Sequence, residues 1–316
     1  MNEKASNRRF SGVRAVDLFA GIGGMRLGFE AWGAETVFAC DLDPHAQSLY
    51  EANFGVRPAG DLTRISPEAI PDHDVLLAGF PCQPFSIIGK MNGFADTRGT
   101  LFFAVEEILR AKRPYAFLLE NVKQLATHDG GKTFETIVRS LRALGYCVYA
   151  QTLNALDFGL PQKRERLFIV GFAQNVPFVF PRPAAERIPL DRILEPDDEV
   201  DPRLFASDRI VAQRWQKLKT IPFYPSIWHE NKSGNVSVLP YSCALRSNGS
   251  HNYLLVNGRR RLSPREMLRL QGFPEDFKIT VGYSAMRKTT GNSVAVPVVR
   301  AIAQKMLSVM SGDCVA

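Results

Sequence analysis

The sequence predicts an α/β protein whose parallel sheet is covered by helices on both faces, followed by a second, smaller domain. Three observations carry this prediction. Apolar, β-prone runs alternate with helical patterns of about ten residues. The first apolar run ends in a glycine-rich turn. Polar and glycine residues gather where the predicted strands end, which is where ligands bind in sheets of this kind.

The elements of the predicted sheet follow from these patterns in order. Six apolar runs predict its strands, at 13–19, 35–41, 74–79, 115–120, 146–153 and 167–172. Three helical patterns lie between them, at 25–32, 100–110 and 133–144. A fourth helix opens with Asp43 as its N-cap and Pro44 at its first position. The order of strands and helices therefore favours crossover connections and a parallel sheet.

Composition sets the class of protein. The chain has 316 residues, and 45% of them are hydrophobic, which is enough for a full core and excludes disorder as the main state. No run approaches the ~18 apolar residues of a membrane span, and residues 1–9 lack the apolar run of a secretory signal. We expect a soluble cytoplasmic protein without a membrane partner. The five cysteines form no CxxC pair, so neither a disulfide framework nor a metal site is expected.

The second half of the chain differs from the first in amino-acid composition and charge. Residues 177–202 are rich in proline and acidic residues and look like a domain boundary. The net charge is +7, yet residues 209–290 alone hold 14 basic and four acidic residues, a net of +10. Such a block favours a polyanion, with nucleic acid as the leading candidate, although a solvated basic surface has the same composition. The predicted organisation is a main domain over 1–176, a second domain over 177–280, and a C-terminal segment over 281–316 that returns to the first, with an apolar helix at 292–310.

Four clusters at the predicted strand ends carry chemistry. Gly21 and Gly23 would let a ligand approach the backbone, and Asp41, about twenty residues on, is placed as an acid that binds ribose hydroxyls. Cys82 lies between two prolines, where a rigid loop would hold a nucleophilic thiol. Each cluster also has a purely structural explanation, as a turn without a ligand or as a small buried cysteine.

The other two clusters are charged. Glu120 ends the strand 115–120 and could act as a general acid or base, or equally as a structural acid. Arg164 and Arg166 alternate, so in an extended segment both would point to one side and suit a phosphate or carboxylate. An exposed run of charges is the alternative interpretation of these arginines.

The motifs in sequence order resemble one family. They are DLFAGIGG (17–24), GFPCQPFS (79–86), ENV (120–122), QKRER (162–166), RLSPREMLRLQGFP (261–274) and GNSVAVPVV (291–299). This ordered set resembles the C5-cytosine DNA methyltransferases of bacterial restriction–modification systems, of the small HhaI type, over about residues 12–310. The resemblance implies a Rossmann-like methyltransferase fold that uses S-adenosylmethionine, with a smaller target-recognition domain, and it thins over about 175–258, the variable recognition region of that family.

The resemblance implies a covalent mechanism on a cytosine flipped out of duplex DNA. Cys82 matches the thiol that attacks carbon 6 and thereby activates carbon 5 for methylation. Glu120 matches the acid near ring N3, and Arg166 matches the arginine at the exocyclic oxygen. Arg164, the motif neighbour of Arg166, completes the predicted catalytic set.

Cofactor and DNA contacts carry over residue by residue. The cofactor residues implied are Phe19, Ala20, Gly21, Gly23, Asp41, Leu42, Asp61, Pro81, Asn292 and Ser293. Asp41 stands where the family usually has Glu, and Leu42 where the HhaI-type enzymes have an aromatic that packs on adenine. The DNA contacts implied are Gln83, Ser86, Asn231, Lys232, Ser233, Asn235, Arg246, Ser247 and Asn248, which are polar residues able to pair with base edges. A bacterial, nucleoid-associated location follows; a cognate restriction endonuclease on the same site is a partner that the sequence leaves open.

Three other functions remain to be weighed. The RNA-methylating branch has the same core, but its members usually carry a different dipeptide after the catalytic Pro-Cys. A catalytically silent DNA-binding module would not need Cys82, Glu120 and Arg166 together. A nicotinamide oxidoreductase would explain Gly21 and Asp41 but leaves the Pro-Cys loop and the basic domain without a purpose.

Overall fold

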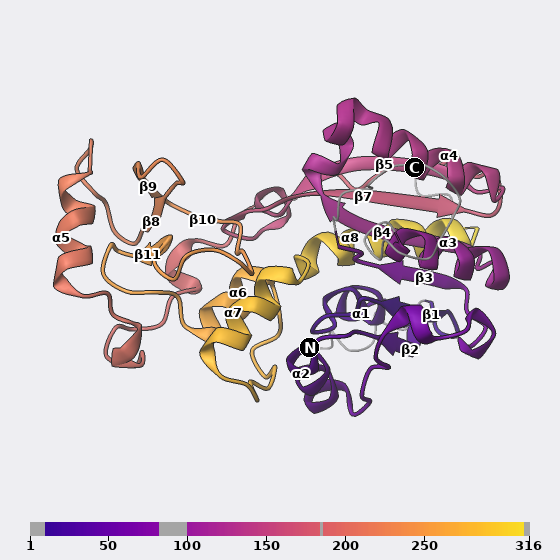
Figure 1. Cartoon of the computed structure of the whole chain (residues 1–316), viewed down its shortest axis with the longest axis horizontal. Coiled ribbons are helices and arrows are strands. Elements are labelled where there is room, and N and C mark those ends of the chain that lie inside the picture. The colour runs from indigo at the N-terminus through magenta and orange to yellow at the C-terminus, as the bar shows by residue number, and fades with distance from the viewer. Residues whose placement is uncertain (1–9, 82–99, 184–185, 313–316) are drawn as a thin grey trace. The chain divides into compact units, whose positions relative to one another are not determined.

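The computed structural model describes residues 10–81, 100–183 and 186–312, which divide into two compact units (Figure 1). Unit 1 comprises 1–153, 165–182 and 298–316, and unit 2 comprises 154–164 and 183–297. This division differs from the predicted one in three places. Residues 154–164 belong to unit 2, residues 177–182 belong to unit 1, and the chain returns to unit 1 at Val298 rather than at residue 281. The cause of the late return is that helix α7 (Tyr283–Asn292) packs against α6 (Pro264–Gln271) inside unit 2.

The α/β core predicted from the sequence is confirmed in unit 1. Its six-stranded sheet has the order β2-β1-β3-β4-β7-β5. The strands are β1 (Arg14–Leu18), β2 (Glu35–Cys40), β3 (Val75–Ala78), β4 (Ala116–Val122), β5 (Cys147–Asn154) and β7 (Glu165–Phe172). The helices are α1 (Gly24–Glu30), α2 (Pro44–Phe54), α3 (Thr100–Lys112), α4 (Lys132–Ala143) and α8 (Val296–Met310).

One expectation about the sheet was wrong, because β7 pairs antiparallel with β4. The pairs β1–β2, β1–β3 and β3–β4 are parallel, as predicted. Parallel neighbours need a crossover of a dozen or more residues, usually a helix. Residues 155–164, between β5 and β7, contain no α-helix and only the two-residue strand β6 (Gln162–Lys163), so β7 enters the sheet by a short return.

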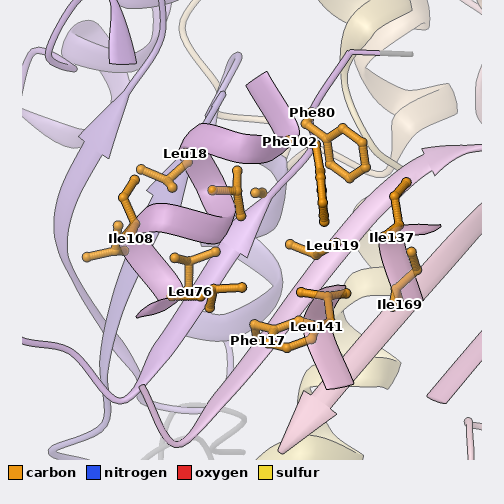
Figure 2. Packing of buried hydrophobic residues seen from close by; sticks show 14 of the residues in the cluster. Leu18, Leu76, Phe80, Phe102, Ile108, Phe117, Leu119, Ile137, Leu141 and Ile169 are labelled. Carbon is orange, nitrogen blue, oxygen red and sulfur yellow. The ribbon is translucent and has the colours of Figure 1, made fainter. Parts of the chain in front are cut away.

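The two faces of the sheet are covered by different helices. On one face, Ile108 of α3 and Ile137 and Leu141 of α4 pack on Leu119 and its neighbours in a single apolar cluster (Figure 2). On the other face, α1 contacts β1 and β2, and α2 adds Tyr50. Alternation along each strand assigns its residues to these two faces.

Glycines fix two close approaches in unit 1. Gly28 of α1 faces Val299 of α8, and a Cβ at Gly28 would lie 2.6 Å from Val299 Cγ1. Gly171 of β7 is the cross-strand partner of Phe117, whose ring occupies the space where a side chain would stand. Both positions therefore require glycine for packing rather than for backbone conformation.

Unit 2 contains a three-stranded antiparallel sheet and three helices. The sheet has the order β11-β8-β9, with β8 (Ile227–Glu230), β9 (Val236–Leu239) and β11 (Leu254–Val256). Helix α5 (Asp208–Gln216) precedes this sheet, and α6 and α7 follow it. Short strands and polar loops were expected here, whereas these helices were not. Trp228 is fully buried in β8 and centres the apolar packing.

The predicted helix at 292–310 is two helices. Alpha-helix α7 ends at Asn292, and α8 begins at Val296. Among the described residues, the stretch Tyr283–Met310 is long and apolar enough to cross a membrane. In its most apolar 18 residues, 61% is buried inside the protein. Core helices of soluble proteins pass the same test, so this stretch is weak evidence for a span.

Gly171→Ala tests the packing of the sheet. A methyl group there would lie 2.1 Å from Phe117 Cζ, so the strands must shift, and we expect a loss of about 2 kcal/mol in the free energy of unfolding. Urea denaturation measures this loss. The control is Gly60→Ala, because a Cβ at Gly60 would meet no atom within 4 Å. Equal midpoints for the two variants would contradict the β4–β7 register.

Candidate active site

A glycine-rich turn follows β1, as predicted, and its backbone is left-handed at three points. Phe19 has a φ of +55°, Gly21 of +55° and Gly23 of +85°. A bulky residue such as Phe19 rarely adopts this region, and such strain concentrates at functional sites. Gly23 has a second constraint, because a Cβ there would lie 2.3 Å from Phe54 Cε2, whereas a Cβ at Gly21 would enter open space. Space beside Gly21 is thus available to a ligand.

Asp41 joins this turn to the end of β2. Its Oδ2 accepts a hydrogen bond from the Gly21 N–H at 2.7 Å, and its Oδ1 accepts one from the Asp43 N–H at 2.8 Å. The next residue, Leu42, is 71% exposed, so an apolar side chain projects beside the acid. The structure therefore brings Gly21, Asp41 and Leu42 together, as the sequence predicts.

Asp61 follows a segment that runs beside the end of β2. Asp41 N–H donates to Ala59 O at 2.9 Å, and Cys40 Sγ donates to Gly60 O at 2.8 Å. Asp61 caps the next turn by accepting from the Thr63 hydroxyl and N–H, and these hydrogen bonds lower the pKa of its carboxyl. Burial raises the pKa of the Cys40 thiol to about 12, which makes Cys40 a structural cysteine rather than a nucleophile.

Glu120 and Arg166 form an ion pair across β4 and β7. Val122 is the cross-strand partner of Arg166, and Glu120 is the partner of Phe168, so Glu120 and Arg166 are diagonal neighbours on one face of the sheet. Arg166 Nε lies 2.9 Å from Glu120 Oε1, and the two side chains are 17% and 10% exposed. The acid and the guanidinium predicted from separate motifs are thus in direct contact.

The end of β3 lies beside this pair. A Cβ at Gly79 would stand 3.6 Å from Glu120 Oε2, so the chain that leaves β3 passes in contact distance of the carboxylate. Asn121 Nδ2 donates to Phe80 O at 2.9 Å and holds the chain where it leaves β3. Pro81 follows and is exposed. Cys82, Gln83 and Ser86 lie outside the described residues, so their predicted roles stay predictions.

The structure corrects the expectation that Arg164 and Arg166 serve one anion. Arg164 is 2% exposed and belongs to unit 2. Its guanidinium donates to the carbonyls of Leu245 and Gly291 at 3.1 Å and to that of Ser293. Because Arg164 precedes β7, the alternation that places Arg166 beside Glu120 does not extend to it. Arg164 therefore binds the backbone of unit 2, and its predicted catalytic role stays a prediction.

Gln162 completes this network and was missed by the sequence analysis. Its side-chain amide donates to Leu270 O at 2.7 Å, and its Oε1 accepts from the Leu245 N–H at 3.0 Å. Gln271 in turn donates to Thr290 O at 2.7 Å. In the sequence, Gln162 only opens the charged run QKRER, which gives no sign that its side chain is buried.

Asn292 and Ser293 lie at the end of α7 in unit 2. Asn292 is exposed, whereas Ser293 is buried and its carbonyl accepts from Arg164. Their predicted contact with the cofactor stays a prediction.

The predicted DNA-contacting residues of unit 2 lie on two turns. Asn231, Lys232, Ser233 and Asn235 are all exposed on the turn between β8 and β9. Asn231 Oδ1 accepts from the N–H groups of Ser233 at 2.9 Å and Asn235 at 3.0 Å, so this side chain builds the turn that carries the others.

The second turn, 246–252, is fixed from three sides. The Arg246 N–H donates to the Tyr253 hydroxyl at 2.9 Å, and the Arg246 guanidinium lies 5.6 Å from the Tyr253 ring centroid. Arg287 donates to Gly249 O at 2.8 Å. A Cβ at Gly291 would lie 2.4 Å from Ser247 N, so this glycine lets α7 approach the turn. Arg246 and Asn248 are exposed, and Ser247 is half-buried.

Asp17 is a second residue that the site prediction missed. It is 1% exposed at the end of β1, and its Oδ2 has no hydrogen-bond partner within the protein. Burial raises the pKa of its carboxyl to about 8; Arg26 opposes this shift and Asp41 adds to it. In the sequence, the only sign of this buried acid was a single aspartate within an apolar strand. No group of three or more His, Cys, Asp or Glu residues in the described part of the chain could hold a metal ion.

A match to a family model shows which protein family contains this chain. The model of the C-5 cytosine-specific DNA methylases matches residues 13–204 and 205–308. This chain belongs to that family. It is therefore an enzyme, a DNA (cytosine-5-)-methyltransferase, and neither a nicotinamide oxidoreductase nor a silent binding module.

Curated relatives and solved structures agree with the family. The chain is 62% identical to the Type II methyltransferase M.HaeII of Haemophilus aegyptius over 93% of both chains, and 61% identical to M.NgoBI of Neisseria gonorrhoeae over 91% of both. It is 40% identical to M.HhaI of Haemophilus parahaemolyticus over 94% of this chain and 95% of that one. The S. pombe Dnmt2 methyltransferase has the same fold, with a TM-score of 0.73 at 21% identity, over 95% of this chain and 99% of that one.

Asp17→Asn tests the buried acid of this methyltransferase. The folded carboxyl keeps its proton up to a pH of about 8, whereas in the unfolded chain it releases the proton near pH 4. Between these values the folded state binds one proton more, so stability falls as pH rises, by at most about 1.4 kcal/mol per unit. The variant should lack this slope in urea midpoints taken from pH 5 to 7. Parallel pH profiles for the wild type and the variant would show that Asp17 is ionised.

Arg164→Met tests the structural role assigned to Arg164. Three buried carbonyls lose their donors, so we expect a loss of about 3 kcal/mol in the free energy of unfolding of unit 2. Arg166→Met is the matched control, and it should lose methyl transfer with a smaller loss of stability. Urea denaturation followed by tryptophan fluorescence separates the two. A higher midpoint for Arg164→Met than for Arg166→Met would exclude the assignment.

Proposed function

We propose that this methyltransferase transfers the methyl group of S-adenosylmethionine to carbon 5 of a cytosine flipped out of a specific duplex DNA site, through a covalent bond between Cys82 and carbon 6. We further propose that it is the modification enzyme of a restriction–modification system, with an endonuclease that cuts the same site. The names of its relatives, Type II methyltransferases at 61% and 62% identity, support this role.

The proposed chemistry starts from the weak nucleophilicity of carbon 5. When the Cys82 thiolate forms a bond to carbon 6, electron density moves toward carbon 5 and ring N3. Glu120 stabilises N3 through a shared proton, and Arg166 donates to the exocyclic oxygen. Once carbon 5 carries the methyl group, which the cofactor would supply and so become S-adenosylhomocysteine, its proton passes to water. The electrons of that C–H bond re-form the double bond between carbons 5 and 6, and the thiolate departs. The covalent route divides one difficult step into easier ones.

The Glu120–Arg166 ion pair is the observation that carries this proposal. A flipped cytosine presents N3 and its exocyclic oxygen side by side on one edge, and the pair presents a carboxylate and a guanidinium side by side at 2.9 Å. Both side chains are largely buried, so their interactions with the base are weakened little by water. Gly79, three residues before Cys82 in the sequence, lies beside the carboxylate.

The residues of unit 1 fit S-adenosylmethionine. The open space at Gly21 admits close approach to the backbone, and Asp41 at the end of β2 is the carboxylate proposed for the ribose hydroxyls. Exposed Leu42 offers apolar contact for adenine, Asp61 an acceptor for its amino group, and Pro81 an adjacent surface. The cofactor supplies an electrophilic methyl group; Phe19, Ala20 and Gly23 shape its turn, and Asn292 and Ser293 complete the proposed set.

Binding of duplex DNA falls to the exposed turns of unit 2 and to Gln83 and Ser86. Flipping the cytosine costs a few kcal/mol, which the contacts to DNA must offset. The first measurement is transfer of labelled methyl to unmethylated plasmid DNA, with RNA as a parallel substrate. Label in DNA as 5-methylcytosine supports the proposal, and label in RNA alone contradicts it.

Cys82→Ala tests the nucleophile. Without the thiol no bond to carbon 6 forms, so methyl transfer should fall below detection while DNA binding is kept. Cys147→Ala is the matched control, since Cys147 is half-buried in β5 and should leave activity unchanged. Filter binding and labelled methyl transfer measure the two properties. Full activity of the Cys82 variant would remove it as the nucleophile.

A further inference from the structure

Exposed apolar side chains concentrate in the last turn of α5 and the residues after it, in unit 2. Within ten residues, four large side chains are exposed: Trp215 by 46%, Ile221 by 94%, Phe223 by 46% and Tyr224 by 57%. Water-exposed apolar groups concentrated in this way mark a contact surface more often than isolated ones do. We name residues 215–224 the aromatic segment.

Both ends of the aromatic segment are anchored. The Trp215 ring meets the buried Trp228 ring edge-on, with centroids 5.1 Å apart. Just past the other end, the Ser226 N–H donates to Asn257 Oδ1 at 2.9 Å. Pro222 restricts the backbone between them. The exposed side chains are therefore presented from fixed ends.

The charge around the aromatic segment is positive. Residues 208–230 contain four basic and two acidic side chains. Glu230 pairs with Arg214 at 2.8 Å and with Lys217 at 2.6 Å, and Arg209 and Lys219 are exposed. Basic residues interleaved with exposed aromatics suit a polyanion that also offers flat apolar surfaces, which describes nucleic acid.

The aromatic segment and the end of α5 lie close to both turns that are predicted to contact DNA. A Cβ at Gly234, in the turn between β8 and β9, would lie 3.7 Å from Lys217 Nζ. The preceding residue of α5, Arg214, donates to Asn252 O in the second turn at 2.6 Å. Helix α5 thus ties the aromatic segment to residues already assigned to DNA.

We propose that the aromatic segment is a further DNA-binding surface, on which Phe223 and Tyr224 pack against bases or sugars and Lys219 contacts a phosphate. This extends the proposed DNA interface beyond the base-reading turns. Apolar side chains that wedge against base steps help distort a duplex, and distortion is what base flipping requires. The surface would act with the turns rather than replace them.

The double variant Phe223→Ala/Tyr224→Ala tests the proposal on the full chain. Loss of aromatic contact should weaken binding to sheared, unmethylated plasmid DNA about tenfold. Lys219→Ala should lower the slope of log affinity against log salt by about one, because one phosphate contact is lost. Ile188→Ala is the matched control, as an apolar side chain of unit 2 that is 44% exposed and lies outside the segment. At saturating DNA the double variant should still transfer methyl groups, which separates this proposal from the catalytic one.

A second measurement does not depend on those variants. Acrylamide quenching of Trp215, obtained as the difference between the wild type and Trp215→Phe, should decrease when plasmid DNA binds. Unchanged quenching together with unchanged affinity of the double variant would overturn the proposal. So would a double variant that alters sedimentation of the free protein but not DNA affinity, because the segment would then be a contact between copies of the chain.

Discussion

The antiparallel pairing of β4 with β7 is the constraint on which the geometry of the candidate active site depends. It sets Arg166 diagonal to Glu120, so that a guanidinium and a carboxylate from distant parts of the chain meet on one face. Because side chains alternate along a strand, a slip of one residue would turn Arg166 to the opposite face. Phe117 packing over Gly171 in the same ladder opposes such a slip, since a different register would place a side chain against that ring. An apolar contact thereby secures the register of an ionic one.

The same segment continues backward into a buried polar network that organises unit 2. Arg164 and Gln162, just before β7, bind backbone groups of residues 245, 270, 291 and 293. Burying a guanidinium costs free energy unless acceptors receive its N–H groups. Here backbone carbonyls at fixed positions accept these hydrogen bonds. The network therefore demands one arrangement of the segments that flank α7. A single short motif thus supplies one arginine to the ion pair with Glu120 and another to this network.

Much of the fold could be predicted from the sequence, because the decisive signals are local. Apolar runs with the right period gave the six strands, and Asp43–Pro44 marked the start of α2. Ser263, Pro264 and Glu266 carried an equally local capping signal for α6, so that helix was predictable although it was not predicted. The direction of β7 could not be predicted, because a buried strand has the same apolar pattern whether it runs parallel or antiparallel to its neighbour.

The site was predictable only where the family motifs specify it. Glu120 and Arg166 were named from separate motifs, but nothing local shows that they touch, because their pairing depends on strand register. Arg164 looked like Arg166 by alternation, yet its environment is set by carbonyls more than eighty residues away, which no local pattern contains. Asp17 and Gln162 were missed for the same reason. Whether a polar residue faces a ligand or the protein interior depends on tertiary contacts.

The turns predicted to contact DNA show how hydrogen bonds within the fold limit which bases a side chain could recognise. Asn231 Oδ1 is already shared by two backbone N–H groups, so its side chain is left chiefly as a donor through Nδ2. Pairing with adenine by two hydrogen bonds needs both the oxygen and the nitrogen of the amide. Asn231 is therefore unsuited to that contact and serves to shape the turn. Lys232, Ser233 and Asn235, whose backbone it fixes, keep exposed side chains. In the proposed DNA interface, discrimination among bases at this turn thus falls to these three residues, with Asn231 fixing the backbone that presents them.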